Sequence, residues 1–168
     1  MKKIFLLLIT SFALWSCDNK DDKTTKPIDQ LPPETQTGAN TFGFLLNGKP
    51  IIVKNTSQQT AIYQQNQLQL GGGIDNDIND VSVIITVGGP LNTNVIYDLS
   101  YPNNIAIFVN NKENCYYDYP NTLDGNLILT HIDQEKFIVS GRFEFSTVTD
   151  GCEDIKITNG RFDLKYIP

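Results

Sequence analysis

Apolar and polar residues alternate in short runs from residue 41 onward, which is the period-two pattern of β-strands. Phe42, Phe44 and Leu46 alternate before Asn47-Gly48, a dipeptide typical of hairpin turns. The run 81–87 alternates in the same way. No segment repeats apolar residues at helical spacing over three turns. The pattern therefore predicts an all-β domain.

The predicted strands are short, and turn-rich gaps separate them. They cover residues 41–46, 51–53, 60–64, 67–70, 81–87, 95–99, 105–109, 136–148 and 154–167, with a further strand opening at Leu127. Pro50 cannot donate a hydrogen bond to a neighbouring strand, so we expect the strand around it to lie at a sheet edge. The arrangement predicts one antiparallel β-sandwich or flattened barrel over residues 41–168, mostly a meander with a long C-terminal hairpin.

The last predicted strand contains a change of face. Apolar residues occupy one parity at Ile155 and Ile157 and the other parity from Phe162 onward. A hairpin turn or a β-bulge at Asn159-Gly160 could explain the change, because a bulge adds one residue and flips the side chains that follow. The length of the partner strand, residues 136–148, favours the bulge.

Two carboxylates of this hairpin, Glu144 and Asp163, could form a glycosidase pair. Each lies two residues from an arginine on the same outward face, Arg142 and Arg161 respectively. On neighbouring antiparallel strands this spacing favours a charged cross-strand ladder over catalysis.

The N-terminus has the form of a lipoprotein signal peptide. The positive Met1-Lys2-Lys3 precedes an apolar stretch, residues 4–14, that is too short to span a bilayer. Leu14-Trp15-Ser16-Cys17 then matches a lipobox, in which the cysteine is lipidated and becomes the first residue of the mature chain. We therefore expect residues 1–16 to be removed and Cys17 to anchor the protein in a membrane.

Residues 17–40 are predicted to form the lipidated cysteine and a disordered linker, because they are polar, rich in proline and without apolar periodicity. Lys20-Asp21-Asp22 resembles the charged export signal of Bacteroidetes-type surface lipoproteins. Asp18, directly after the cysteine, would instead imply retention in the inner membrane under enterobacterial sorting rules.

The mature chain is acidic. Removal of Lys2 and Lys3 with the leader lowers the formal charge from −6 to −8, and it also removes the one tryptophan. A chain without a basic patch is not expected to bind nucleic acid.

Three segments of the chain consist of strand and turn patterns. They are Thr41-Phe42-Gly43-Phe44-Leu45-Leu46-Asn47-Gly48-Lys49, Ile138-Val139-Ser140-Gly141-Arg142-Phe143-Glu144-Phe145 and Ile157-Thr158-Asn159-Gly160-Arg161-Phe162-Asp163. In these segments the chain resembles an uncharacterised family of small Bacteroidetes-type lipoproteins, over roughly residues 1–168. The resemblance implies a lipid-anchored protein of the outer membrane, exposed at the cell surface. The family has no established activity or ligand, so the resemblance implies no site.

Segments that resemble catalytic or metal-binding motifs lack residues that those motifs require. Residues 75–80 begin like a calcium loop, but Asp80 stands where that loop needs glycine. Gly71-Gly72-Gly73 lacks the residues of a phosphate loop and is interpreted as a strand end. His131 has no nucleophile motif or cysteine cluster to work with. We therefore expect a protein that is not an enzyme, with no metal and no cofactor.

Tyrosines form one concentration of aromatic residues, and some of them are expected to be exposed. They are Tyr97, Tyr101, Tyr116, Tyr117 and Tyr119. Exposed tyrosines beside Asn and Asp could contact a glycan or a peptide, whereas edge-strand packing is the alternative.

Cys115 and Cys152 are the thiols left once Cys17 is acylated. In an oxidising compartment we expect them to form a disulfide; two free cysteines are the alternative. Two functions remain open: a surface-anchored binding or interaction module, or a structural or accessory subunit of an envelope complex without a small ligand.

Overall fold

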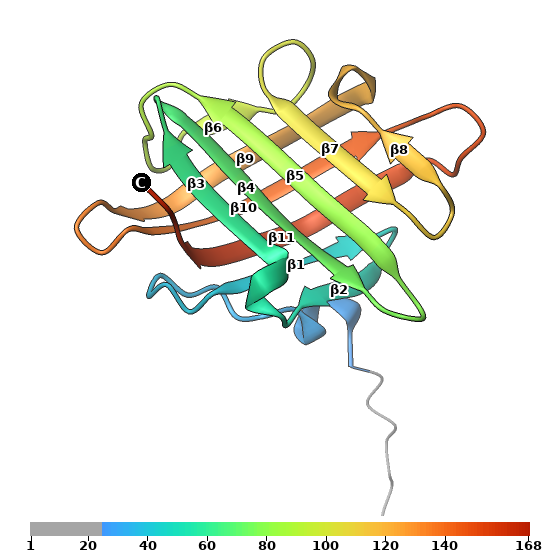
Figure 1. Cartoon of the computed structure of the whole chain (residues 1–168), viewed down its shortest axis with the longest axis horizontal. Coiled ribbons are helices and arrows are strands. Elements are labelled where there is room, and N and C mark those ends of the chain that lie inside the picture. The colour runs from blue at the N-terminus through green and yellow to red at the C-terminus, as the bar shows by residue number, and fades with distance from the viewer. Residues whose placement is uncertain (1–24) are drawn as a thin grey trace, which may run out of the picture.

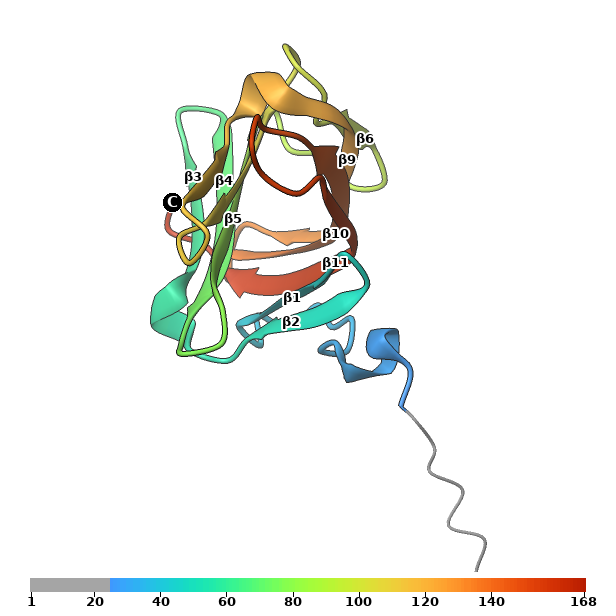
Figure 2. The ribbon, with the colours of Figure 1, turned by 90° about the vertical axis from the view of Figure 1, so that its right-hand side faces the viewer.

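The structure is a computed structural model that describes residues 25–168. Eleven strands form two antiparallel sheets that pack face to face (Figures 1 and 2). The sheets have different members and stay open, so the fold is a β-sandwich rather than a flattened barrel. The predicted signal peptide, Cys17 and the Lys20-Asp21-Asp22 motif lie outside the described residues.

The larger sheet contains six strands. In their order of pairing these are β2 (Lys49–Val53), β1 (Thr41–Leu46), β11 (Ile155–Lys165), β10 (Ile138–Thr147), β9 (Thr122–Asp133) and β6 (Ile96–Asp98). As Pro50 predicts, β2 is an edge strand. The long hairpins that join β9, β10 and β11 form the centre of this sheet.

The smaller sheet contains five strands. In their order of pairing these are β3 (Gln59–Gln64), β4 (Gln67–Asp75), β5 (Asp80–Gly88), β7 (Ile105–Asn110) and β8 (Cys115–Tyr117). This sheet is a meander that the chain leaves once, to place β6 beside β9. Three short 3-10 helices complete the described elements: η1 (Pro27–Gln30), η2 (Thr56–Gln58) and η3 (Tyr119–Asn121).

A β-bulge interrupts β11, as the change of face predicts. The register with β10 shifts between Phe143 and Phe145, and Asn159 has a φ of 53°. The next residue is Gly160, where a side chain would not fit, because a Cβ there would lie 2.6 Å from the Phe143 ring. The bulge therefore lets one strand of eleven residues pair with β10 on both sides of Asn159-Gly160 and keep its apolar side chains on the core face.

Inward-facing side chains of both sheets form one core. Phe42, Phe44, Phe143 and Phe162 pack together with ring centroids 5.3 to 6.4 Å apart. Gly72 lies opposite this cluster, and a Cβ at that position would be 2.5 Å from the Phe42 ring. The triple glycine is thus not a strand end: β4 continues through it to Asp75, because Gly72 makes room for an aromatic ring of the other sheet.

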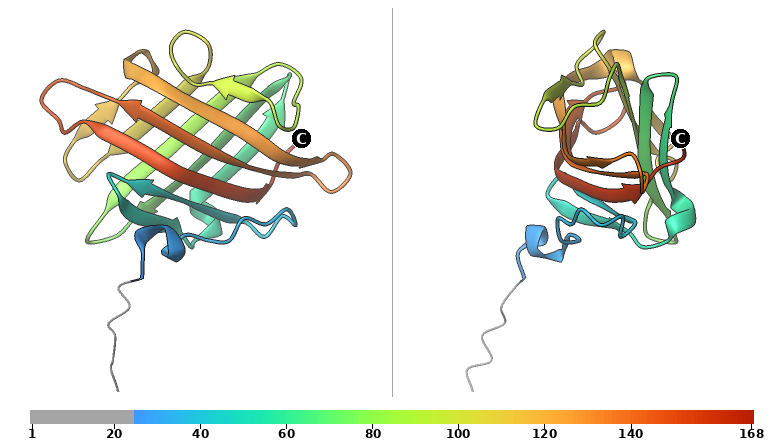
Figure 3. Two further views of the ribbon diagram at one scale, coloured as in Figure 1. Left: turned by 180° about the vertical axis from the view of Figure 1, so that it is seen from behind. Right: turned by 90° about the vertical axis from the view of Figure 1, so that its left-hand side faces the viewer.

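Residues 31–39, part of the predicted linker, are ordered against the outer side of the larger sheet, and we call them the strap. Leu31 is buried, and Pro32 lies against Gly43 of β1. Figure 3 (left) shows this segment in blue beside β11 and β1. The linker prediction is wrong for these residues, because a distant carboxylate binds them although they have no apolar periodicity.

That carboxylate is Asp163 of β11, which is fully buried beneath the strap. Its oxygens accept hydrogen bonds from the backbone N–H groups of residues 37–39, at 2.8 to 3.1 Å, and from the hydroxyls of Thr35 and Ser140. Burial alone would raise the pKa of Asp163, but these hydrogen bonds outweigh it and lower the pKa from 3.8 to about 2. The strap is therefore held by a charged, fully bonded carboxylate.

Candidate functional site

The strap covers only part of the larger sheet, and the uncovered part of its outer face carries a shallow polar trough. A hollow of about 470 Å³ lies over β9, β10 and β11. A second hollow of about 330 Å³ adjoins it, and Glu34 of the strap is one of its walls. Asn126 and Glu144 line both hollows. We call the two hollows together the polar trough.

Side chains along the polar trough are hydrogen-bonded to one another. Asn126 Nδ2 donates to Glu144 Oε1 at 3.0 Å, and Ser146 Oγ donates to Asp124 Oδ1. These pairs follow from the register, because β9 and β10 place Asn126 opposite Glu144 and Asp124 opposite Ser146. The side chains are therefore held in defined positions on a rigid sheet rather than on loops.

The cations of the polar trough come from β10 and β11. Arg142 Nε donates to Glu34 Oε2 at 2.7 Å, which joins the sheet to the strap. Arg161 Nη1 donates to the Pro32 carbonyl at 3.4 Å, whereas its buried Nε has no hydrogen-bond partner among the described residues. Lys156 lies at the other end. The polar trough thus presents both cationic and anionic side chains, and both hydrogen-bond donors and acceptors.

The predicted charged ladder is not formed. Arg142 lies opposite Arg161 in the register, so two like charges face each other across the strands. Asp163 is buried and bound by the strap, and Arg142 pairs with Glu34 of the strap. Reasoning from the hairpin alone failed because the strap supplies partners from more than 100 residues away in the sequence.

The predicted tyrosine surface divides into separate places. Tyr117 belongs to the core, where its hydroxyl donates to the Glu153 carbonyl at 2.6 Å, so it cannot be a contact residue. Burial, with Glu113 and Glu153 nearby, raises its pKa. Tyr97 is half-buried, and its hydroxyl accepts from the Asn92 N–H at 2.7 Å.

The other three tyrosines reach solvent to different extents. Tyr101 and Tyr119 pack on each other with ring centroids 5.6 Å apart. Tyr116 is exposed on the opposite side of the molecule from the polar trough, on the smaller sheet. The five tyrosines therefore form no single contact surface.

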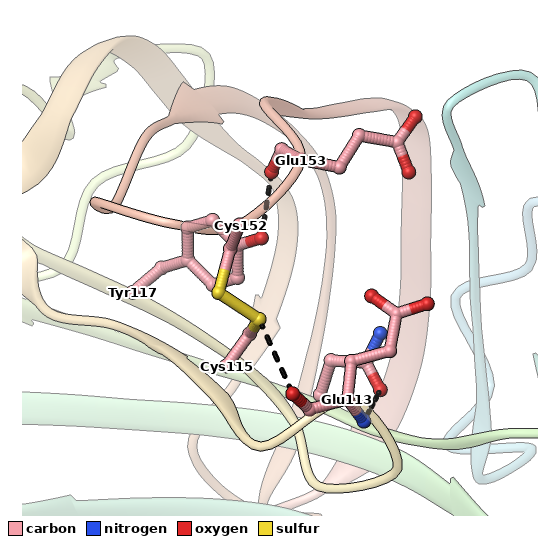
Figure 4. Close-up of a disulfide and its surroundings, with 6 residues drawn as sticks. Glu113, Cys115, Tyr117, Cys152 and Glu153 are labelled. Atoms are coloured by element: carbon pink, nitrogen blue, oxygen red, sulfur yellow. Dashed lines mark hydrogen bonds between the residues drawn. A yellow bond between two sulfur atoms is a disulfide. The ribbon is translucent and has the colours of Figure 1, made fainter.

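Cys115 and Cys152 form a disulfide, as predicted, with Cα atoms 6.2 Å apart (Figure 4). The bond joins the start of β8 in one sheet to the turn between β10 and β11 in the other. The Tyr117 hydrogen bond to Glu153 lies beside it. A disulfide of this kind indicates an extracytoplasmic, oxidising compartment.

His131 and the calcium-like loop 75–80 make contacts that belong to the fold. His131 lies in β9 opposite Ser140. In the loop, Asn76 Oδ1 accepts from the Ile78 and Asn79 N–H groups, and Lys112 Nζ donates to the Asp77 carbonyl. Within residues 25–168 no group of three or more His, Cys, Asp or Glu side chains is placed to hold a metal ion. Over the same residues, no helix has the length and apolarity needed to cross a membrane.

Sequence reasoning missed most of the polar trough. The alternation of polar and apolar residues along β10 predicts an outward polar face, but it does not predict that Asp124, Asn126, Ser146 and Lys156 lie together on it. Comparisons with protein-family models, curated proteins and solved structures find no match to this chain. The geometry of the chain itself must therefore carry any proposal about its function.

Proposed function

We propose that this chain is a lipid-anchored surface protein that binds a hydroxyl-rich ligand, an oligosaccharide segment, in the polar trough. The observation that carries the proposal is the row of pre-paired side chains around Asn126 and Glu144, which line both hollows. A site whose polar groups are already oriented loses little entropy when a ligand binds.

The chemistry of the polar trough suits sugar hydroxyls. Each hydroxyl can donate to a carboxylate such as Glu144 and accept from an amide such as Asn126. Charges of both signs are mixed there, which does not favour a strongly anionic ligand such as nucleic acid. Because the polar trough is open along the sheet, an internal segment of a long oligosaccharide can enter it. Binding without catalysis is part of the proposal, since Asp124 and Glu144 are each already engaged by a neighbouring donor.

The proposed location rests on the sequence of the leader. The lipobox at Cys17 favours lipid anchoring, and Lys20-Asp21-Asp22 favours display on the outer face of the outer membrane. The disulfide supports a location of the domain outside the cytoplasm.

Binding of residues 25–168 to an array of oligosaccharides, followed by calorimetry on the best ligand, tests the proposal. Glu144→Gln removes the charge with little change of shape and should weaken binding about tenfold, the effect of one hydrogen bond to a charged group. Glu135→Gln, in the exposed turn between β9 and β10, is the matched control and should bind normally. Binding that is equal in all three proteins, or absent for every sugar, would contradict the proposal.

A structural or accessory subunit is the second candidate. The observation that favours it is that β7 is apolar on its outer as well as its inner face. A stable partner recovered with the protein from membranes, with no effect of Glu144→Gln, would favour this candidate.

A further inference from the structure

The outer face of the smaller sheet is apolar along β7, which is unlike a solvent-facing strand. Antiparallel sheets in sandwiches usually alternate apolar inward and polar outward residues. In β7, Ala106 and Phe108 are buried in the core, yet the outward positions are Ile105, Ile107 and Val109. A strand that is apolar on both faces is typical of a sheet covered on both sides.

Charge is missing from the same face. We call residues that pair across neighbouring strands a row. Between the row that contains Gly73 and the row that contains Ile62, no outward-facing residue of the five strands is Lys, Arg, Asp or Glu. Asp75 and Asp80 mark its border at the hairpin between β4 and β5. The centres of protein interfaces are similarly depleted of charge and enriched in tyrosine. The face therefore fits a protein partner better than solvent.

The face has one hole and one knob. The hole is a hollow of about 320 Å³ over Gly71 and Gly73, which point outward and have no side chain to fill it; Asp75 and Asp80 of the border also line it. The knob is Tyr116 of β8, whose side chain is 54% exposed.

Knob and hole lie in the same row across the sheet. Tyr116 pairs with Val109, Val109 with Ser82, and Ser82 with Gly73. Three strand spacings separate Tyr116 from Gly73, which corresponds to about 14 Å. A two-fold axis parallel to the strands, midway between β5 and β7, would place each Tyr116 over the hole of a facing copy.

We propose that a second copy of this chain packs on this face, with Tyr116 of each copy in the glycine hole of the other. The same operation brings Val109 of one copy over Ser82 of the other, so the contact is isologous and closed. Five strands with a mean length of about seven residues give a flat area on the order of 550 Å². That area is near the low end of what each partner of a specific interface buries. η1 and the strap lie on the other sheet and leave the face free (Figure 2).

Photo-crosslinking in cells that make the full chain tests this pairing. A benzophenone amino acid replaces Tyr116, and after illumination mass spectrometry identifies the peptide to which it is joined. The expected product is a dimer joined to the segment of a second copy that contains Gly71, Gly73 or Ser82. A product with a different protein, or no product, would overturn the proposal.

Charge substitution gives an independent test on the purified, detergent-solubilised full chain. Ile107→Lys puts a cation at the centre of the face and should weaken dimerisation about tenfold or more, because a buried unpaired charge is costly. Leu123→Lys is the matched control, since Leu123 is an exposed residue of the other sheet, at 62%, and should leave the dimer intact. Analytical ultracentrifugation over a range of concentrations measures both. A chain that is monomeric throughout, or a dimer that Ile107→Lys leaves unchanged, contradicts the pairing.

Discussion

Asp163 shows how one residue can decide whether a segment is ordered. It is a buried carboxylate whose hydrogen bonds come mainly from the strap, and within residues 25–168 it forms no salt bridge. Replacing it by Asn puts an amide donor against several N–H donors. We expect Asp163→Asn to lower the free energy of unfolding by about 2–4 kcal/mol, measured by urea denaturation at pH 7.

The same residue predicts a dependence on pH. The pKa of Asp163 is lowered from 3.8 to about 2 in the folded chain, so its contribution is present above the unfolded pKa. It is lost as pH falls from about 5 to 2, and it amounts to roughly 2.5 kcal/mol. The gap in stability between the native chain and Asp163→Asn should therefore narrow over that range. A gap that stays constant from pH 6 to pH 2 would show that the carboxylate is not charged in the fold.

At the scale of elements, β4 and β1 approach each other through a glycine. Gly72→Ala would place a Cβ 2.5 Å from the Phe42 ring, so it should cost about 1–3 kcal/mol of stability. Gly88→Ala is the matched control, because nothing lies within 4 Å of a Cβ there. Thermal unfolding of the two variants compares them directly. Equal melting temperatures would mean that the ring moves aside without cost.

Periodicity predicted most elements and not the strap. Alternation finds a strand because one face of it is buried, and the change of parity at Asn159-Gly160 revealed the bulge for the same reason. The strap has no such period, since its order comes from hydrogen bonds to Asp163. The polar trough escaped prediction because it depends on the pairing of β9 with β10, and Asn126 and Glu144 are separated by a turn whose register the sequence alone does not specify.

For the whole molecule, the disulfide joins the two sheets across a sequence separation of 37 residues. Chain-entropy estimates for a loop of that length give about 3–4 kcal/mol of stabilisation. The double variant Cys115→Ala/Cys152→Ala should lose about that much, measured by denaturant unfolding. Without a reducing agent, Cys115 and Cys152 should resist alkylation. A double variant as stable as the native protein would contradict this account.

The proposed anchor makes a prediction for the chain in its cell. Cys17→Ala should leave the precursor uncleaved or move the protein out of the detergent-rich phase, because the lipid cannot be attached. Phase partitioning and immunoblotting of the precursor measure this. Unchanged partitioning together with normal processing would exclude lipidation at Cys17.

The packing of η1 against the domain sets how far the domain could stand from a membrane under the proposed anchoring at Cys17. If residues 17–40 were all flexible, the extended tether could reach about 80 Å. Because η1 begins at Pro27 and packs beside β2, only nine residues lie between it and Cys17, and the ten Cα–Cα steps from Cys17 to Pro27 span at most about 35 Å. That reach is close to the diameter of the domain itself. With the proposed anchor at Cys17, the domain would stay within about its own diameter of the membrane, so the proposed ligand would have to reach it at the membrane surface.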